Sequence, residues 1–169
     1  MTHPMVDQLR FTRREFMRGV ANLSDADARK RVQPMNCISW NIGHLAWQEQ
    51  RYFLYRGLGQ ILLPAVQEQF AYGAPGSTPS LDEVLAAWGK ITAAVDPWLQ
   101  ELTSEKLAQL YVVDGKPGGT TYGNLLQRTI YHYWYHNGEN MAIRQSLGHK
   151  DLAEFVGDID AEAPYRPEI

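Results

Sequence analysis

The sequence predicts an all-α protein built as a four-helix bundle, with a long crossover between the second and third helices. Apolar residues recur at helical spacing over four long segments, and little of the chain has the pattern of strands. The connection from Gly57 to Pro79 is long for a compact domain, which favours a crossover. We expect a single domain over residues 1–169, with a flexible, extended tail from about residue 158.

The first two predicted helices precede this crossover. The first covers about Met5 to Leu23, with its arginines, Arg13 among them, on the surface. A short polar turn follows over residues 24–32. The second covers about residues 38–56, with Ser39 as its expected N-cap. This segment is apolar on two faces, which indicates a central place in a bundle or contact with a second subunit.

The other two predicted helices follow the crossover. Ser80–Glu83 matches the capping box of a helix N-terminus, and Pro97 is expected to kink or restart the third helix. Residues 110–122 favour a small hairpin. The fourth helix is predicted from near Tyr122 to Gly148, because a glycine suits the position just after a helix end.

Composition disfavours several classes of protein. The formal net charge is −3 and no run of lysine or arginine occurs, so we expect no nucleic-acid partner. Cys37 is the single cysteine, which allows no intramolecular disulfide and fits a reducing compartment and a small buried side chain. We find no signal peptide and no apolar run approaching the ~20 residues that span a bilayer. The expectation is a cytoplasmic protein that does not bind membranes.

Three of the five histidines fall on helices that we expect to face each other. His132 and His136 are four residues apart on the longest predicted helix, so they lie one turn apart on its interior face. His44 lies on the second helix. Buried imidazoles need partners for their nitrogens. A divalent metal bound by these three side chains satisfies them and leaves coordination positions open.

Other interpretations of the same spacing stay open. Histidines four apart also occur in bundles where they only bond carbonyls or tyrosines. Two metal motifs are excluded: Tyr133 replaces the glutamate that follows the first histidine of a zincin, and no histidine has a glutamate three residues before it, as a di-iron bundle requires. Cys37 lies about 10 Å along a helix from His44, too far to bind the same ion.

Several further residues are candidates for the site. Glu139 lies one turn beyond His136. It is a candidate catalytic base or a partner that orients an imidazole, and the alternative is an exposed carboxylate without a role in the site. Glu49 and Arg51 are expected to be surface or interface charges. Four aromatic residues are expected either to line a pocket or, as is more common, to belong to the core: Trp40, Trp47, Tyr133 and Trp134.

Two segments carry a resemblance to a known family. Trp40–Glu49 resembles the W-H-x-G-H-x-x-W segment of the DinB-like superfamily, and Tyr131–Gly148 resembles the last bundle helix of that superfamily. The order of helices and the crossover extend the resemblance over nearly the whole chain. It implies a four-helix bundle, often a homodimer, whose three metal-binding histidines are here His44, His132 and His136. The metals known in the family include zinc, nickel and iron.

The resemblance also implies a class of activity. Relatives include thiol-dependent transferases and isomerases, and the amino-terminal part of hercynine oxygenases, whose second catalytic domain this chain has no room for. Asn41 stands where the pattern often has another histidine, which is not the usual ligand. An open three-histidine site can lower the pKa of bound water toward ~7 or bind a thiolate. We expect a hydrolase or thiol transferase acting on a small molecule; the alternatives are a non-catalytic metal-binding protein and a purely structural bundle.

Overall fold

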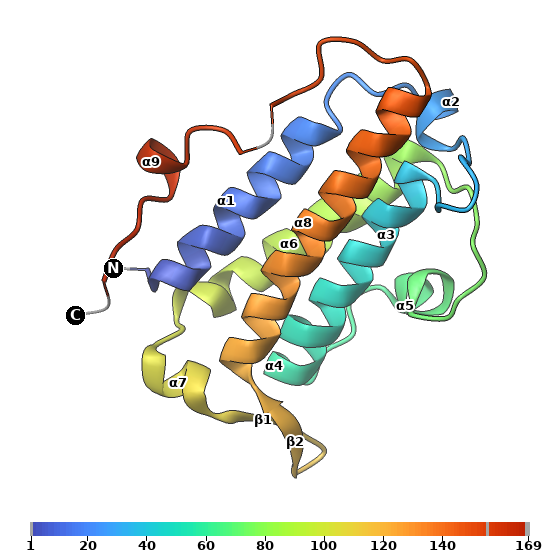
Figure 1. Ribbon diagram of the computed structural model, residues 1–169. Coiled ribbons are helices and arrows are strands. Elements are labelled where there is room, and N and C mark those ends of the chain that lie inside the picture. The colour runs from blue at the N-terminus through green and yellow to red at the C-terminus, as the bar shows by residue number, and fades with distance from the viewer. Residues whose placement is uncertain (1, 155, 168–169) are drawn as a thin grey trace.

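The computed structural model describes residues 2–154 and 156–167 and is mostly helical, with one small two-stranded sheet (Figure 1). The long helices are α1 (Pro4–Gly19), α3 (Ile38–Glu49), α6 (Leu81–Gln100) and α8 (Tyr122–Ser146). The short helices are α2 (Asp25–Ala28), α5 (Pro64–Phe70), α7 (Ser104–Ala108) and α9 (Ile159–Glu162). α8 packs on α1 and α3, and α3 packs on α6.

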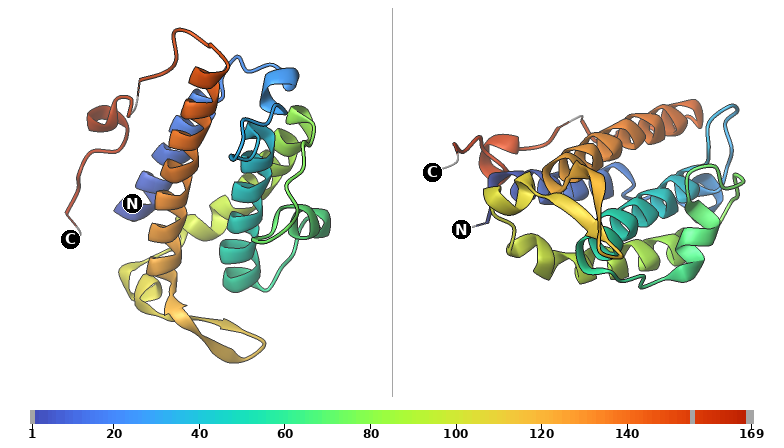
Figure 2. Two further views of the ribbon diagram at one scale, coloured as in Figure 1. Left: turned by 45° about the vertical axis from the view of Figure 1, so that its right-hand side comes forward. Right: turned by 90° about the horizontal axis from the view of Figure 1, so that it is seen from below.

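The connection between α3 and α6 crosses the length of the molecule. α3 and α6 run in the same direction, whereas α1 and α8 run in the opposite one (Figures 1 and 2). The chain therefore returns along the side that carries α5 before α6 begins, as the predicted crossover requires. The sequence interpretation treated residues 57–79 as one long connection and did not predict α5, which begins at Pro64. Proline is tolerated in the first turn of a helix, which is where Pro64 lies.

The structure corrects one predicted helix end and one predicted N-cap. α1 ends at Gly19 rather than Leu23. α3 begins at Ile38 as predicted, but Cys37 is its N-cap and Ser39 lies inside the helix. Beyond α3 the chain continues without a break as a π-helix, η1 (Gln50–Tyr55), and then as α4 (Arg56–Leu58). Each π turn takes in an extra residue, which shifts the faces of all later side chains.

The structure corrects one prediction about α6 and narrows another. Ser80 is the N-cap residue, but its side chain makes no capping hydrogen bond. The backbone N–H of Leu81 instead donates to Oδ1 of Asp25, on α2, at 2.8 Å. Pro97 lies inside the helix and does not restart it, so of the two predicted effects only a kink stays a prediction. It comes in the last turn, where a proline removes a single backbone hydrogen bond and few residues follow it.

The predicted hairpin and the last helix are present. β1 (Leu110–Val113) pairs antiparallel with β2 (Lys116–Thr121). The two turn residues, Asp114 and Gly115, both have positive φ, as a two-residue hairpin turn of type I′ requires. α8 begins directly after β2, and Gly148 follows its end with φ +84°. In the tail, α9 interrupts the predicted extended segment, of which residues 168 and 169 lie outside the described part.

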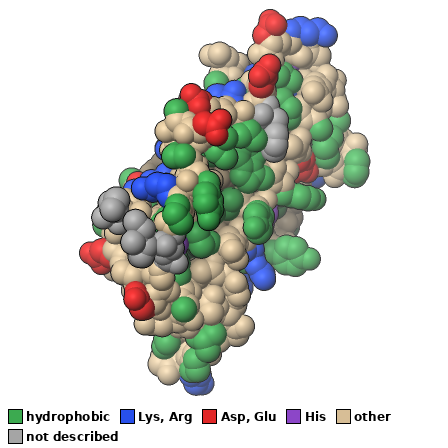
Figure 3. Space-filling model, turned by 60° about the vertical axis from the view of Figure 1, so that its left-hand side comes forward, with side chains coloured by type: hydrophobic (Ala, Val, Ile, Leu, Met, Phe, Trp, Pro, Cys, Tyr) green, Lys and Arg blue, Asp and Glu red, His purple; other side chains and the backbone are tan. Residues whose placement is uncertain are grey.

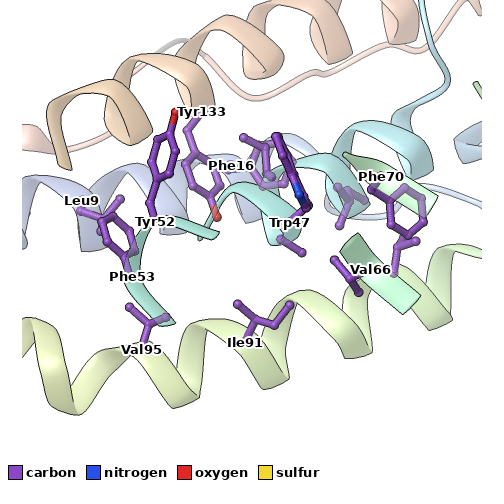
Figure 4. Packing of buried hydrophobic residues seen from close by; sticks show 14 of the residues in the cluster. Leu9, Phe16, Trp47, Tyr52, Phe53, Val66, Phe70, Ile91, Val95 and Tyr133 are labelled. Atoms are coloured by element: carbon purple, nitrogen blue, oxygen red, sulfur yellow. The ribbon is translucent and has the colours of Figure 1, made fainter. Parts of the chain in front are cut away.

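The core lies between the long helices and extends beneath α5 (Figure 4). Phe16 of α1 meets Tyr133 of α8 edge-on, with ring centroids 5.2 Å apart. Val66 and Phe70 of α5 are buried in the same cluster. All residues of α3 are buried, so its predicted central place is confirmed. Because the chain itself covers both apolar faces of α3, those faces no longer support the predicted homodimer.

The predicted surface positions of Arg13 and Glu49 are wrong. Their exposed fractions are 6% and 0%. Nε of Arg13 donates to Oε1 of Glu49 at 2.8 Å, its Nη2 donates to Oε2, and its Nη1 donates to Asp96 at 2.7 Å. The hydroxyl of Tyr133 donates to Oε1 of Glu49 at 2.7 Å and accepts from Nε1 of Trp88 at 2.6 Å. A buried ion pair with additional hydrogen bonds therefore joins α1, α3, α6 and α8.

The face that carries α1 and the C-terminal tail has a mixed surface. Figure 3 shows side chains of both charges scattered among apolar ones on this face. Two ion pairs hold the tail against α1, Arg14 with Glu162 at 2.7 Å and Arg166 with Asp7. In the described part of the chain, no helix combines the length and the apolar character that crossing a membrane requires.

Candidate metal centre

Three histidines from two neighbouring helices meet between α3 and α8. His44 comes from α3, and His132 and His136 come from consecutive turns of α8. One ligand nitrogen from each lies within 4.8 Å of the other two. Nε2 of His132 and Nε2 of His136 are 3.0 Å apart. Two nitrogens bound to one tetrahedral metal at ~2.0–2.1 Å are about 3.3 Å apart, so the spacing suits a shared ion.

Two of the imidazoles are oriented by a hydrogen bond on their outer nitrogen. Nδ1 of His44 donates to the carbonyl of Phe70 at 2.7 Å. Nδ1 of His136 donates to Oε2 of Glu139 at 2.8 Å. With the proton on Nδ1, the lone pair of Nε2 faces the other histidines. This is the arrangement of metal-binding histidines, whose second nitrogen usually donates to a carbonyl or a carboxylate.

The third imidazole has an unsatisfied nitrogen. Nδ1 of His132 is buried and has no hydrogen-bond partner among the described residues. If that nitrogen holds the proton, the Nε2 lone pairs of His132 and His136 face each other at 3.0 Å. If Nε2 holds it instead, the Nδ1 lone pair has no donor. A cation between the Nε2 atoms removes the repulsion of the first arrangement, so the residues fit a metal ion.

The surroundings of His44 and His132 keep these two imidazoles uncharged at neutral pH. Burial, with the neighbouring charges of His136 and His44, lowers the pKa of His132 to about 3. Burial also lowers the pKa of His44, and the hydrogen bond to Phe70 offsets part of that shift. At neutral pH both rings are therefore neutral, the form in which imidazole binds a metal.

A close approach of α5 to α3 positions His44. A Cβ atom at Gly43 would lie 2.7 Å from the ring of Phe70, so only glycine leaves room for that ring. The same approach brings the carbonyl of Phe70 to Nδ1 of His44. Sequence reasoning assigned neither Gly43 nor Phe70 a role. A glycine directly before a candidate ligand, in an otherwise apolar helix, was the available signal.

Glu139 is held against His136 rather than free at the site. Its Oε2 accepts from Nδ1 of His136 and, at 2.9 Å, from Nδ2 of Asn41. The same Asn41 nitrogen donates to Oδ1 of Asn140 at 2.8 Å. This geometry suits a partner that orients an imidazole, one of the roles considered for Glu139; a role as catalytic base remains a prediction. Sequence reasoning missed that Asn41, one turn before His44, supports this carboxylate.

We expect Glu139→Gln to lower metal affinity by about 10–100-fold, because outer partners of metal ligands typically contribute that much. The glutamine keeps a hydrogen-bond acceptor for His136 but loses the negative charge. Competition with a chelator measures the change, and Glu101→Gln, at an exposed position after α6, is the matched control. Unchanged affinity combined with lost turnover would contradict the orienting role and assign Glu139 to the chemistry.

The aromatic residues predicted near the histidines have different surroundings. The ring of His44 lies between two indoles, stacked on Trp40 at 4.8 Å and on Trp47 at 5.1 Å. Trp47 also lines a cavity of about 540 Å³. Tyr133 is fully buried in the core, and Trp134 is half-buried beside α1. Of the four candidates, Trp47 is therefore the one that lines this cavity.

Comparison with known proteins gives one family. A sequence model of the DinB superfamily matches residues 8–139. The matched segment contains most of α1 and of α8, all of α3 and α6, and the crossover, with all three histidines of the centre. None of the curated proteins compared with the chain matches it.

Proposed function

Because the chain belongs to the DinB superfamily, we propose that it is a metal-dependent enzyme that acts on a small molecule. Its four long helices form the bundle of a single domain, and three histidines hold a divalent ion, zinc, nickel or iron: His44, His132 and His136. The observation that carries the proposal is the convergence of three ligand nitrogens within 4.8 Å. Three protein ligands leave positions for a substrate.

Thiol transfer is the reaction that these surroundings favour. When bound, a divalent metal lowers the pKa of a coordinating thiol or water, so that the nucleophile forms at neutral pH. Hydrolysis usually also uses a free general base. Among the described residues, Glu139 is the only carboxylate that hydrogen-bonds to any of the three histidines, and its Oε2 accepts from His136 and Asn41. A thiol needs less assistance because its pKa is far below that of water.

The residues of the chain have separate roles in this proposal. Phe70 and Glu139 keep the imidazoles of His44 and His136 in the binding tautomer. The indoles of Trp40 and Trp47 cover both faces of His44 and exclude water from it. Transfer forms a sulfur–carbon bond while the bond from that carbon to its leaving group breaks. The thiol proton passes to solvent.

Elemental analysis of untagged protein, followed by a turnover assay, tests the proposal. We expect about one divalent metal per chain, as for other three-histidine centres. Loss of a thiol in the presence of an electrophilic aryl halide measures transfer, and a panel of esters and amides measures hydrolysis. Turnover should vanish on chelation and return with the metal.

The other interpretations predict different results. A non-catalytic metal-binding protein retains its metal but turns over none of these substrates. A purely structural bundle contains no metal, and a chelator does not change its stability. Cleavage of an ester or amide without thiol transfer would show that the protein is a hydrolase and not a transferase.

Family resemblance also leads us to propose a homodimer. Two tyrosines on the outer side of α8 offer apolar surface, since Tyr131 and Tyr135 are 68% and 71% exposed. Light scattering at micromolar concentration measures the mass. A mass close to 19.2 kDa, that of one chain, would contradict the dimer.

A further inference from the structure

Three arginines near α3 and α8 have no acidic partner among the described residues. Within residues 2–154 and 156–167, the side chains of Arg51, Arg56 and Arg128 make no hydrogen bond or ion pair. Every other described arginine makes at least one, in most cases to a carboxylate: Arg10, Arg13, Arg14, Arg18, Arg29, Arg31, Arg144 and Arg166. The unpaired arginines therefore belong to one region rather than to the surface in general.

These three arginines lie toward the same end of the candidate metal centre. α3 and α8 run in opposite directions, so residues after His44 and residues before His132 approach the end that carries the hairpin (Figure 1). Arg51 follows His44 by seven residues, about 10 Å along a helix, and Arg128 precedes His132 by four, about 6 Å. Burial lowers the pKa of Arg56, and the positive charges of Arg51 and Arg128 lower it further. Arg56 is thus close enough to Arg51 and to Arg128 for their charges to repel its own.

Aromatic rings hold two of these guanidinium groups. The guanidinium carbon of Arg51 lies 5.2 Å from the ring centroid of Trp47. That of Arg56 lies 4.8 Å from the ring of Tyr52 and 4.5 Å from the ring of Tyr111, in the hairpin. Stacking on a ring stabilises a cation without using its N–H groups. The donors of both arginines therefore remain available to a ligand.

A cavity lies beside Arg51, and the ring of Trp47 separates it from His44. Its volume of about 540 Å³ lies within the range of ~300–1,000 Å³ that is typical of small-molecule sites. Arg51 is the one charged residue among those that line it: Trp47, Gln50, Arg51, Tyr55, Ile61, Gln67, Ala71 and Tyr72. Trp47 forms the boundary, with the Arg51 guanidinium on its ring and His44 stacked against it at 5.1 Å.

We propose that Arg51, supported by the charges of Arg56 and Arg128, binds an anionic group of the substrate, a carboxylate or a phosphate. Arginine presents a planar fork of donors that matches either group with two parallel hydrogen bonds. The aromatic residues that line the cavity cover an apolar middle part of the substrate. The other end of the substrate reaches past Trp47 to the histidines. The inference rests on the proposed function for that other end. The substrate class is an elongated acidic thiol.

Two thiols that differ only in their far end test this inference. Calorimetric titration compares 6-mercaptohexanoate with 6-mercaptohexanol, on the zinc-loaded protein and on the metal-free protein. We expect the acid to bind about tenfold more tightly than the alcohol in both, because a charge-assisted hydrogen bond contributes on that scale. Arg51→Gln should remove the preference. Arg14→Gln, at an arginine on α1 that is paired with Glu162, should retain it.

The outcomes separate this inference from the proposed metal chemistry. Equal binding of acid and alcohol by the unaltered protein, or the same preference in Arg51→Gln, would overturn anion recognition. If zinc leaves both affinities unchanged while the acid preference persists, the metal proposal fails and anion recognition stands. A further titration with 6-mercaptohexylphosphonate distinguishes the two anionic groups: tighter binding than hexanoate assigns a phosphate, weaker binding a carboxylate.

Discussion

His132→Ala is expected to abolish the stabilisation that metal gives to the protein. A ligand that binds only the folded state adds about 2.7 kcal/mol at 100 times its dissociation constant. For a chain of this length that amounts to a rise of several degrees in melting temperature. Without His132 only two imidazoles remain, and the affinity should fall by more than the ~10–100-fold typical of outer partners. Thermal unfolding in zinc and in chelator measures the difference.

A histidine outside the centre provides the control for this experiment. His149 lies beyond the end of α8, where it contacts Arg144 and Asp27 rather than the other imidazoles. His149→Ala should therefore keep the full shift between zinc and chelator. His132 is half-buried, unlike His44 and His136, so its removal disturbs the packing least. A zinc-dependent shift that persists in His132→Ala would rule out the three-histidine site.

Glu49→Ala is expected to destabilise the fold by about 3–5 kcal/mol, because it leaves the buried cation of Arg13 without its main partner. The Tyr133 hydroxyl loses its acceptor in the same substitution. Asp96 stays beside Arg13, but its side chain is 47% exposed and compensates only in part. Urea unfolding, followed by circular dichroism, measures the change in the free energy of unfolding.

Two variants show whether the loss comes from an unpaired charge. Arg13→Met combined with Glu49→Leu removes both charges and should recover most of the stability, since apolar replacements of a buried ion pair are often neutral. Arg14→Gln breaks an exposed pair on the same helix and should cost less than about 1 kcal/mol. If Glu49→Ala costs no more than Arg14→Gln, the buried pair contributes nothing to the fold.

Much of the fold follows from patterns that the sequence displays directly. The spacing of apolar residues predicts the long helices, and the length of the segment between residues 57 and 79 predicts the crossover. The turn residues Asp114 and Gly115 mark the hairpin. The features that the sequence pattern does not predict depend on contacts between residues far apart in the sequence. The capping partner of α6 is Asp25 on another helix, and Arg13 is buried because Glu49, 36 residues later, neutralises it.

The candidate site likewise has a part that the sequence predicts and a part that it does not. Spacing on one helix brings His132 and His136 together, and a second helix rich in apolar residues brings His44. The group that orients His44 is a backbone carbonyl, which every residue has and no side-chain pattern can identify. Arg51 was expected at the surface or an interface and lies half-buried in a cavity wall, a place that depends on how α5 packs.

The stacking of His44 between two indoles gives the protein a built-in optical signal. Both Trp40 and Trp47 touch the imidazole at one edge of the three-histidine cluster. An ion with unpaired electrons, such as nickel or iron, quenches the emission of tryptophans at this range, whereas zinc has a filled d shell. Fluorescence of the unlabelled chain therefore distinguishes the two kinds of ion without added dyes.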